Sequence, residues 1–141
     1  MQGYDSVAMD IDLEIGGTDQ TFNMLAGRTL QRVINKKEKH ILTTTLLIGT
    51  DGRKMAKTYG NIIALTDSAS EMFGKIMSMG DEQIIPYFTL CTDVPIKTIT
   101  DYGKAMASGD NPKDFKVLLG TEIVTQYCGK EEAVKAAEQF D

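Results

Sequence analysis

The sequence Ile15-Gly16-Gly17-Thr18-Asp19-Gln20 decides the fold of the first part of the chain. Before it, residues 9–15 alternate between apolar and polar side chains, which predicts a β-strand with one face toward a core. After it, apolar residues recur every three or four positions over residues 18–34, which predicts an amphipathic helix capped by Thr18 or Asp19. The apolar positions are Ile11, Leu13 and Ile15, followed by Phe22, Leu25, Ala26, Leu30 and Val33.

The two glycines stand between a predicted strand and a predicted helix N-terminus, a common ligand-binding corner of open α/β sheets. Because glycine has no Cβ, a ligand can approach the backbone closely at this point. The free N–H groups of the helix N-terminus would face such a ligand. The alternative is an ordinary connection, in which the glycines only satisfy the geometry of the turn.

A second strand is predicted over residues 41–48, which are apolar, rich in β-branched side chains and followed by Gly49. We expect this strand to be buried and the polar residues 35–40 before it to be solvated. A strand, a helix and a strand in this order predict a parallel βαβ unit over residues 9–48.

Residues 49–61 are expected to form a loop, because turn-forming residues dominate both of its ends. The loop carries Lys54 and Lys57 after the carboxyl end of the second strand, where two lysines can meet a polyphosphate. The alternative is a solvated basic loop with no ligand.

The remainder of the sequence predicts a helical bundle of about five helices. Ser68-Ala69-Ser70-Glu71 forms a capping box for the first helix, and Pro86 requires the second helix to start late or to bend. Glycine and proline mark the other boundaries, at Gly80, Pro95, Gly109, Asn111-Pro112 and Gly129. The side chains expected to point inward are Met72, Phe73, Ile76, Met77, Ile84, Ile85, Tyr87, Phe88, Leu90, Ile96, Ile99, Tyr102, Met106, Phe115, Leu118, Leu119, Ile123 and Tyr127.

The composition is that of soluble globular proteins, with 42% hydrophobic and 25% charged residues among 141. No apolar run is long enough to span a membrane and no signal-peptide pattern is present, so we expect a cytoplasmic protein. Residues 1–66 carry a net charge of +1 and residues 67–141 a net charge of −6, which is unlike a stand-alone nucleic-acid binder. Cys91 and Cys128 have only His40 to complement them, so we expect buried free thiols and no metal site.

Three short motifs together resemble those of tyrosyl-tRNA synthetases, which are class I aminoacyl-tRNA synthetases. Residues 54–58, Lys-Met-Ala-Lys-Thr, resemble the KMSKS loop of class I enzymes. Residues 16–20, Gly-Gly-Thr-Asp-Gln, resemble the GG(S/T)DQ segment of the bacterial-type tyrosyl enzymes. Residues 2–5, Gln-Gly-Tyr-Asp, are similar to the Gln-x-x-Asp of their tyrosine pocket. The motifs occur in family order with family-like spacing, and the similarity continues to the C-terminus.

The resemblance implies an α/β fold followed by an all-α fold. Residues 1–67 would be the C-terminal part of a Rossmann-like catalytic domain, with a partial parallel sheet and a KMSKS-type loop. Residues 68–141 would be a helical anticodon-binding domain. The implied function is that of a tyrosine–tRNA ligase fragment. A tryptophanyl-tRNA synthetase fragment, a nucleotide-binding module unrelated to aminoacylation and a helical interaction protein remain as alternatives.

The resemblance also implies a role for individual residues. The residues that would bind tyrosine are Gln2, Asp5 and Gln20. The residues that would bind the nucleotide are Gly17, Asp19, Lys54, Met55, Lys57 and Thr58. Among these, Asp5 would accept a hydrogen bond from the phenol hydroxyl. Lys54 and Lys57 would be catalytic, because they would stabilise the negative charge of the departing pyrophosphate.

The sequence departs from the family pattern in two respects. Ala56 and Thr58 replace the two serines of KMSKS, and His40 has no glycine beside it, so that a HIGH-type motif is absent. We therefore expect the chain alone to be inactive. The implied partners are tyrosine, ATP with Mg²⁺, tRNA(Tyr) and, for the full-length protein, a second copy in a homodimer. No tightly bound cofactor and no membrane are expected.

Overall fold

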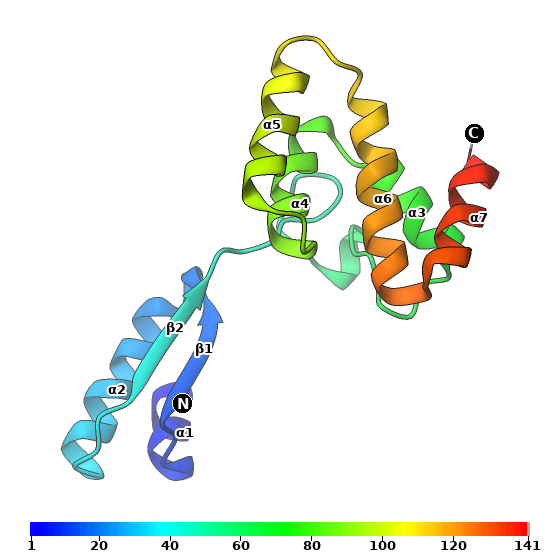
Figure 1. The fold of residues 1–141 in the computed structure, drawn as a ribbon. Helices are drawn as coiled ribbons and strands as arrows, with labels where there is room; N and C mark the ends of the chain where they lie inside the picture. Colours follow the sequence, from blue (N-terminus) through cyan, green and yellow to red (C-terminus); the bar gives the residue numbers. More distant parts are fainter. Residues whose placement is uncertain (141) are drawn as a thin grey trace. The chain divides into compact units, whose positions relative to one another are not determined.

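The computed structural model describes residues 1–140, apart from the side chain of Lys57, and divides into two compact units. Unit 1 is Met1–Leu46 and unit 2 begins at Leu47 (Figure 1). Over the described residues, every helix is too short or too polar to traverse a bilayer. The predicted boundary between residues 67 and 68 separates functional domains, and it stays a prediction.

Unit 1 is a βαβ unit with one additional helix before it. Its elements are α1 (Gln2–Met9), β1 (Leu13–Gly17), a 3₁₀ turn (Thr18–Gln20), α2 (Thr21–Ile34) and β2 (His40–Thr44). The two strands pair in parallel with Gly17 opposite Thr44, which confirms the predicted parallel arrangement. Helix α1 packs against α2 (Figure 1).

Both strands are shorter than the sequence predicts. Residues 9–12 are not part of β1, because Asp10 adopts a left-handed conformation with φ of 48° and ends α1. Residues 45–48 do not continue β2, and Ile48 instead forms an isolated antiparallel bridge with Lys54 in unit 2. The prediction of a buried second strand is wrong, since Ile41 is the one residue of β2 that is not exposed. Within the described residues the sheet has only two strands, so little of β2 is covered.

The apolar stripe predicted for α2 faces outward. The buried residues of α2 are Met24, Gly27 and Gln31. Gly27 lies at the crossing with α1, where an added Cβ would be 3.2 Å from the Cα of Gly3. This close crossing selects the side of α2 with the small residue, and it leaves the large apolar side chains outside. On α2, Phe22, Leu30 and Val33 are at least 41% exposed. Leu13 and Ile15 of β1, which were predicted to face a core, are also exposed.

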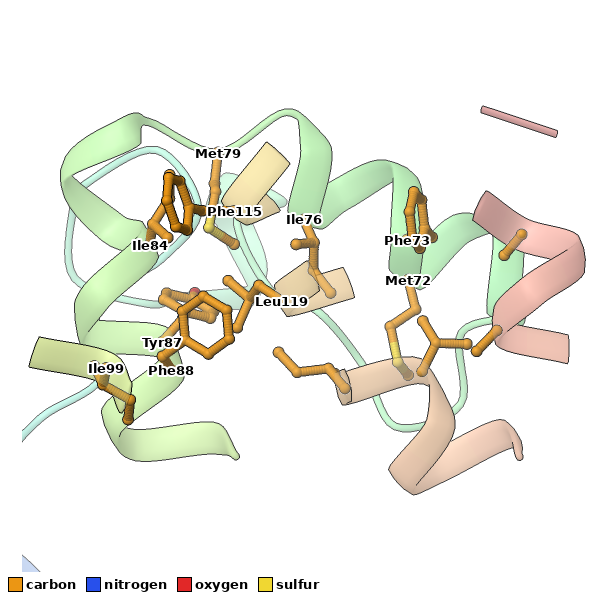
Figure 2. Packing of buried hydrophobic residues seen from close by; sticks show 14 residues of the cluster. Met72, Phe73, Ile76, Met79, Ile84, Tyr87, Phe88, Ile99, Phe115 and Leu119 are labelled. Atoms are coloured by element: carbon orange, nitrogen blue, oxygen red, sulfur yellow. The ribbon is translucent and has the colours of Figure 1, made fainter. Parts of the chain in front are cut away.

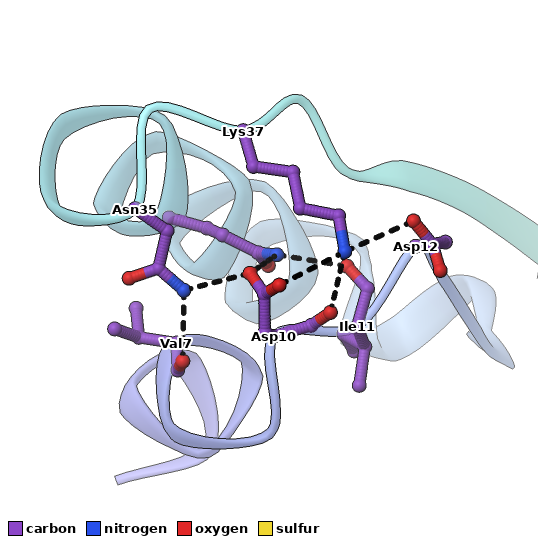
Figure 3. A network of polar contacts seen from close by, with 7 residues as sticks. Val7, Asp10, Ile11, Asp12, Asn35 and Lys37 are labelled. Atoms are coloured by element: carbon purple, nitrogen blue, oxygen red, sulfur yellow. Dashed lines mark hydrogen bonds and ion pairs between the residues drawn. The ribbon is translucent and has the colours of Figure 1, made fainter.

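A polar network joins the end of α1 to the segment after α2 (Figure 3). The Asn35 amide donates to the Val7 carbonyl at 3.0 Å and to the Asp10 carboxylate at 2.8 Å. Lys37 pairs with Asp10 at 3.2 Å. Hydrogen bonds from Asn35 and Lys37 hold the pKa of Asp10 below its usual value. The prediction that residues 35–40 are solvated is confirmed for Lys36, Glu38 and His40 and is wrong for Lys39, which is 1% exposed.

Unit 2 contains the five helices that the sequence predicts between residues 69 and 140. They are α3 (Ala69–Met77), α4 (Ile84–Cys91), α5 (Ile96–Ala107), α6 (Pro112–Cys128) and α7 (Lys130–Phe140). The Ser68–Glu71 capping box is present. Asn111 accepts a hydrogen bond from the Lys113 N–H at 3.0 Å and caps α6. Pro86 lies in the first turn of α4, where its missing N–H removes no helical hydrogen bond.

The apolar faces of these helices meet in one core (Figure 2). The ring of Tyr102 lies 5.2 Å from that of Phe88 and 5.4 Å from that of Phe115, measured between centroids. The fully buried side chains at the centre include Phe73, Ile76, Ile84, Phe88 and Leu119. The prediction of a core position is wrong for four residues, because the apolar stripe of their helix is wider than the surface that neighbouring helices cover. These are Leu90, Ile96, Leu118 and Tyr127, which are 42% to 65% exposed.

Candidate functional site

Gly16 and Gly17 are the last two residues of β1, so the prediction that they form the junction after the strand is wrong, and the 3₁₀ turn Thr18–Gln20 makes that junction. A Cβ at Gly17 would be 2.6 Å from Leu46 Cδ2 and 2.7 Å from Asp19 Oδ1, so only glycine fits without a shift of either side chain. The prediction that Thr18 or Asp19 caps α2 is wrong. The 3₁₀ turn moves the N-cap to Gln20, whose side chain makes no capping hydrogen bond.

Three of the predicted site residues come together at this carboxyl end of β1. Gly17 is half-buried, and Asp19 is exposed. The Gln20 amide accepts a hydrogen bond from Asn23 Nδ2 at 3.1 Å and donates one to Asp19 Oδ2 at 3.4 Å. Because Gly17 pairs with Thr44, the ends of both strands lie beside this turn.

Gln2 and Asp5 lie three residues apart on α1, so they are neighbours on the helix surface. Asp5 is exposed, whereas Gln2 is half-buried and donates from Nε2 to Glu14 Oε1 at 3.0 Å. A depression of about 360 Å³ next to Gln2 is also lined by residues of α2 such as Asn23 and Leu30. The contact between Gln2 and Glu14 was not foreseen from the sequence.

Glu14 belongs to a buried ion pair that the sequence pattern did not predict. The Lys39 side chain is fully buried, pairs with the Glu14 carboxylate and donates to Ser6 Oγ at 2.9 Å. Burial by itself raises the pKa of Glu14, but hydrogen bonds from Lys39 and Gln2 outweigh it and hold that pKa below its usual value. The available signal was the alternation of β1, which places Glu14 on the face opposite Ile15. That face was wrongly assigned to solvent, as was Lys39.

The predicted nucleotide-binding residues of unit 2 lie on a loop, as expected. Lys54 and Thr58 are exposed, and the backbone of Lys57 belongs to a 3₁₀ turn, Lys57–Tyr59. The side chain of Lys57 lies outside the described part of the structure. Met55 is half-buried and lines a cavity of about 190 Å³. The other lining residues are Leu47, Ile63, Leu65, Met72, Tyr87, Cys91, Ile123 and Tyr127.

Asn61 lies at the centre of this loop and is only 3% exposed. Its Oδ1 accepts a hydrogen bond from the Ala56 N–H at 3.0 Å. Its Nδ2 donates to Asp51 Oδ1 at 2.8 Å and to the Lys54 carbonyl at 3.2 Å. The hydrogen bond from Asn61, with those from Arg53, lowers the pKa of Asp51 to about 2. The sequence predicts Asn61 only as a turn former, although a side-chain amide at the end of a loop was the available signal.

Tyr87 of α4 holds the segment that enters the loop. Its hydroxyl donates to the Ile48 carbonyl at 2.8 Å, and burial raises its pKa from 10.0 to about 12. The neutral Tyr87 hydroxyl therefore stabilises unit 2 at every pH below the pKa of tyrosine in the unfolded chain. This contribution is lost as the pH rises through the pKa of Tyr87 in the folded chain. We expect Tyr87→Phe to lower the free energy of unfolding of unit 2 by about 1 kcal/mol at neutral pH, as measured in urea. Tyr127→Phe, at a half-exposed position, is the control, and equal losses in both variants would contradict the assigned role.

Cys91 and Cys128 are free thiols, as predicted, but each is half-buried and not fully buried. Burial raises the pKa of the Cys91 thiol. Cys91 lines the cavity beneath Met55, so its thiol packs as a small apolar group.

Comparison with known proteins shows the family of the chain. Residues 1–141 match the family model described as tRNA synthetases class I (W and Y). The tyrosine–tRNA ligase of Cupriavidus pinatubonensis is 48% identical over 142 aligned residues, which cover 100% of this chain and 34% of that relative. The chain thus spans about a third of the length of that relative.

Two solved structures show the same fold. The tyrosyl-tRNA synthetase of Archaeoglobus fulgidus, complexed with L-tyrosine, has a TM-score of 0.73 at 22% identity, covering 96% of this chain and 49% of its own. The tryptophanyl-tRNA synthetase of Campylobacter jejuni has a TM-score of 0.52 at 21% identity, covering 97% of this chain and 50% of its own. The predicted fold class, a partial Rossmann-like sheet followed by helices, is confirmed. Because the family model matches the whole chain, the chain belongs to the class I tRNA synthetases of the W and Y family.

Proposed function

We propose that the chain is part of a tyrosine–tRNA ligase, which activates tyrosine with ATP and transfers it to its tRNA. The observation that carries this proposal is the 48% identity to a tyrosine–tRNA ligase over the whole chain. The tyrosine-type segment at residues 16–20 and the match of Asp5 to the Gln-x-x-Asp of the tyrosine pocket favour tyrosine over tryptophan as the substrate. Membership of the family argues against an unrelated nucleotide-binding module or a purely helical interaction protein.

Unit 1 supplies the groups that bind tyrosine and the ribose of the adenylate. Gly17 and Asp19 would contact the ribose, because they match the family's GG(S/T)DQ segment and Asp19 presents an exposed carboxylate. Gln20 would bind the reacting end of tyrosine, because its amide is already oriented by Asn23. Gln2 and Asp5 would contact the rest of tyrosine, with Asp5 accepting from the phenol hydroxyl.

Unit 2 supplies the loop that meets the phosphates. In the first step, a carboxylate oxygen of tyrosine attacks the α-phosphorus of ATP, and the bond to pyrophosphate breaks. Lys54 and Lys57 would stabilise the charge on the departing pyrophosphate, while Met55 and Thr58 contribute to the nucleotide site. The described residues gather no cluster of three metal-ligating side chains, so Mg²⁺ would be held mainly by the ATP phosphates.

We propose three further properties for the complete protein. It would bind tRNA(Tyr), with residues 68–141 as the helical anticodon-binding domain and residues 1–67 as part of the catalytic domain. It would act in the cytoplasm and would form a homodimer. The tRNA partner is supported by the names of the relatives, and the helical domain by the bundle that follows the loop. The homodimer and the cytoplasmic location are supported only by the family resemblance.

A chimaeric enzyme tests the proposed function. Residues 1–141 replace the matching third of the Cupriavidus pinatubonensis ligase, and amino-acid-dependent ATP–pyrophosphate exchange is measured. We expect exchange with tyrosine and only background with tryptophan. Asp5→Asn should weaken tyrosine binding by about 10- to 100-fold, because it removes the charged acceptor of the phenol hydrogen bond. Asp93→Asn, at an exposed position in unit 2, is the control. Exchange that depends on tryptophan would contradict the proposal.

A further inference from the structure

The loop that carries Lys54 is organised by one buried side chain. We propose that Asn61 is the positioning residue of this loop, which fixes the backbone of Lys54 and Ala56 and thereby sets where the Lys54 ammonium can reach. The proposal deepens the proposed function, because it rests on the role of Lys54 at the departing pyrophosphate.

The amide of Asn61 uses its hydrogen-bonding groups on the loop itself. An asparagine side chain has two N–H donors and one carbonyl acceptor. The donors reach Asp51 Oδ1 and the Lys54 carbonyl, and the acceptor takes the Ala56 N–H. The backbone on both sides of Met55 is therefore tied to one group that is 3% exposed. A buried polar group with its partners in place favours a single conformation of the segment around it.

The start of the loop is hydrogen-bonded to Asn61 at its end and to Arg53 within it. The Thr50 N–H donates to the Asn61 carbonyl at 3.1 Å, and the Gly49 N–H donates to the Arg53 carbonyl at 2.7 Å. A Cβ at Gly49 would lie 2.2 Å from Asn61 Nδ2, so glycine at this position leaves the space that the amide occupies. Asp51 is fixed in turn, because its carboxylate accepts from Arg53 Nε at 2.8 Å.

Met55 is the other candidate for holding the loop, and its packing is weaker. It is half-buried against a cavity of about 190 Å³, which leaves free space around its side chain. An unbranched thioether adapts to many shapes and does not fix the direction of the backbone. We therefore expect Met55→Leu to be tolerated where a change of Asn61 is not.

The role of Asn61 follows from the flexibility of lysine. The Lys54 ammonium sits on a four-carbon stem, so its reach is defined only if its backbone is fixed. A displacement of about 1 Å in a catalytic group can cost about 100-fold in rate. Loss of the Asn61 amide should therefore lower kcat for adenylate formation and leave the KM for tyrosine unchanged.

The test uses two asparagine-to-aspartate variants of matched chemistry. Asn61→Asp keeps the shape of the side chain but replaces its two donors with an oxygen beside the Asp51 carboxylate. Asn35 has the same kind of partners, a backbone carbonyl at 3.0 Å and an aspartate at 2.8 Å, but it lies in unit 1. Asn35→Asp is therefore the control. Asn61→Ser, which adds no charge, is the second variant should Asn61→Asp fail to fold.

Hydrogen exchange of the 141-residue chain is the first measurement. We expect residues 50–60 to exchange about tenfold faster in both Asn61 variants, with helices α3 to α7 as protected as before. Asn35→Asp should leave the exchange of this loop unchanged. Unchanged exchange of residues 50–60 in the Asn61 variants would overturn the proposal.

Steady-state exchange kinetics of the chimaeric enzyme are the second measurement. In the Asn61 variants kcat should fall by about 100-fold with the KM for tyrosine unchanged, whereas Asn35→Asp should spare kcat. An equal loss of kcat in the Asn35 variant would overturn the proposal. If the unmodified chimaera gives no exchange with tyrosine, the proposed function fails, and hydrogen exchange of the loop still decides the role of Asn61.

Discussion

The isolated chain is expected to form no tyrosyl-adenylate, although both of its units stay folded. The 141 residues contain no HIGH-type motif, so no group of that kind holds ATP in line with the tyrosine carboxylate. Positioning of two reactants is worth about 7–11 kcal/mol of barrier lowering. The remaining electrostatic contacts, such as that of Lys54, supply about 3–4 kcal/mol each and do not restore this loss.

Tyrosine-dependent ATP–pyrophosphate exchange checks this expectation. The chain is assayed alone and with the remaining N-terminal part of a tyrosine–tRNA ligase added in trans. We expect exchange only in the mixture, and we expect Lys54→Ala or Asp19→Ala to abolish it. Lys97→Ala, at an exposed position on α5, is the control and should have no effect. Robust exchange by the isolated chain that is lost in Lys54→Ala would show that the chain needs no further part.

The Glu14→Gln variant should destabilise unit 1 by about 3 kcal/mol, because it removes the charged partner of the buried Lys39 ammonium. This is the lower end of the usual range for a broken buried pair. The lower end applies because the Glu14 side chain keeps 17% exposure, so water can reach the vacated position. Glutamine has nearly the same volume as glutamate, so the loss reports charge and not packing.

The pH dependence of stability separates this ion pair from other effects. The pKa of Glu14 is held below its usual value of 4.5, so the pair stabilises unit 1 above that pH. The contribution is lost as pH falls through the folded-state pKa, and this acid loss should be absent from Glu14→Gln. Urea unfolding, with hydrogen exchange of α1 and α2 as the probe, measures both the loss of stability at neutral pH and the further loss in acid. A Glu14→Gln chain as stable as the unmodified one at neutral pH would show that Lys39 finds another partner.

The helices of unit 2 could be predicted from the sequence, because their boundaries are encoded locally. Ser68, Pro112 and Gly129 each mark a helix end through chemistry that involves residues within one turn. The edges of the core could not be predicted in the same way. Whether Leu118 of α6 is covered depends on how far the neighbouring helices reach, and periodicity carries no information about that.

Unit 1 was predicted less well, because distant residues decide which surfaces are buried. The close crossing at Gly27 and the buried ammonium of Lys39 turn the small and polar side of α2 inward. The family motifs assign roles to Gly17, Asp19 and Lys54 without this information, and those roles stay predictions. The contacts of Gln2 and Asn61 were missed, since their partners lie 5 to 12 positions away and no short pattern specifies them.

The ion pair between Glu14 and Lys39 also restricts how this sequence can change over generations. Replacement of either residue alone leaves a buried group without its partner, whereas a joint replacement by two apolar residues of similar volume is often neutral. A lineage that loses the pair must therefore pass through a less stable ancestor or acquire both substitutions together. Positions 14 and 39 should therefore change together among related sequences, although 25 positions separate them in the chain.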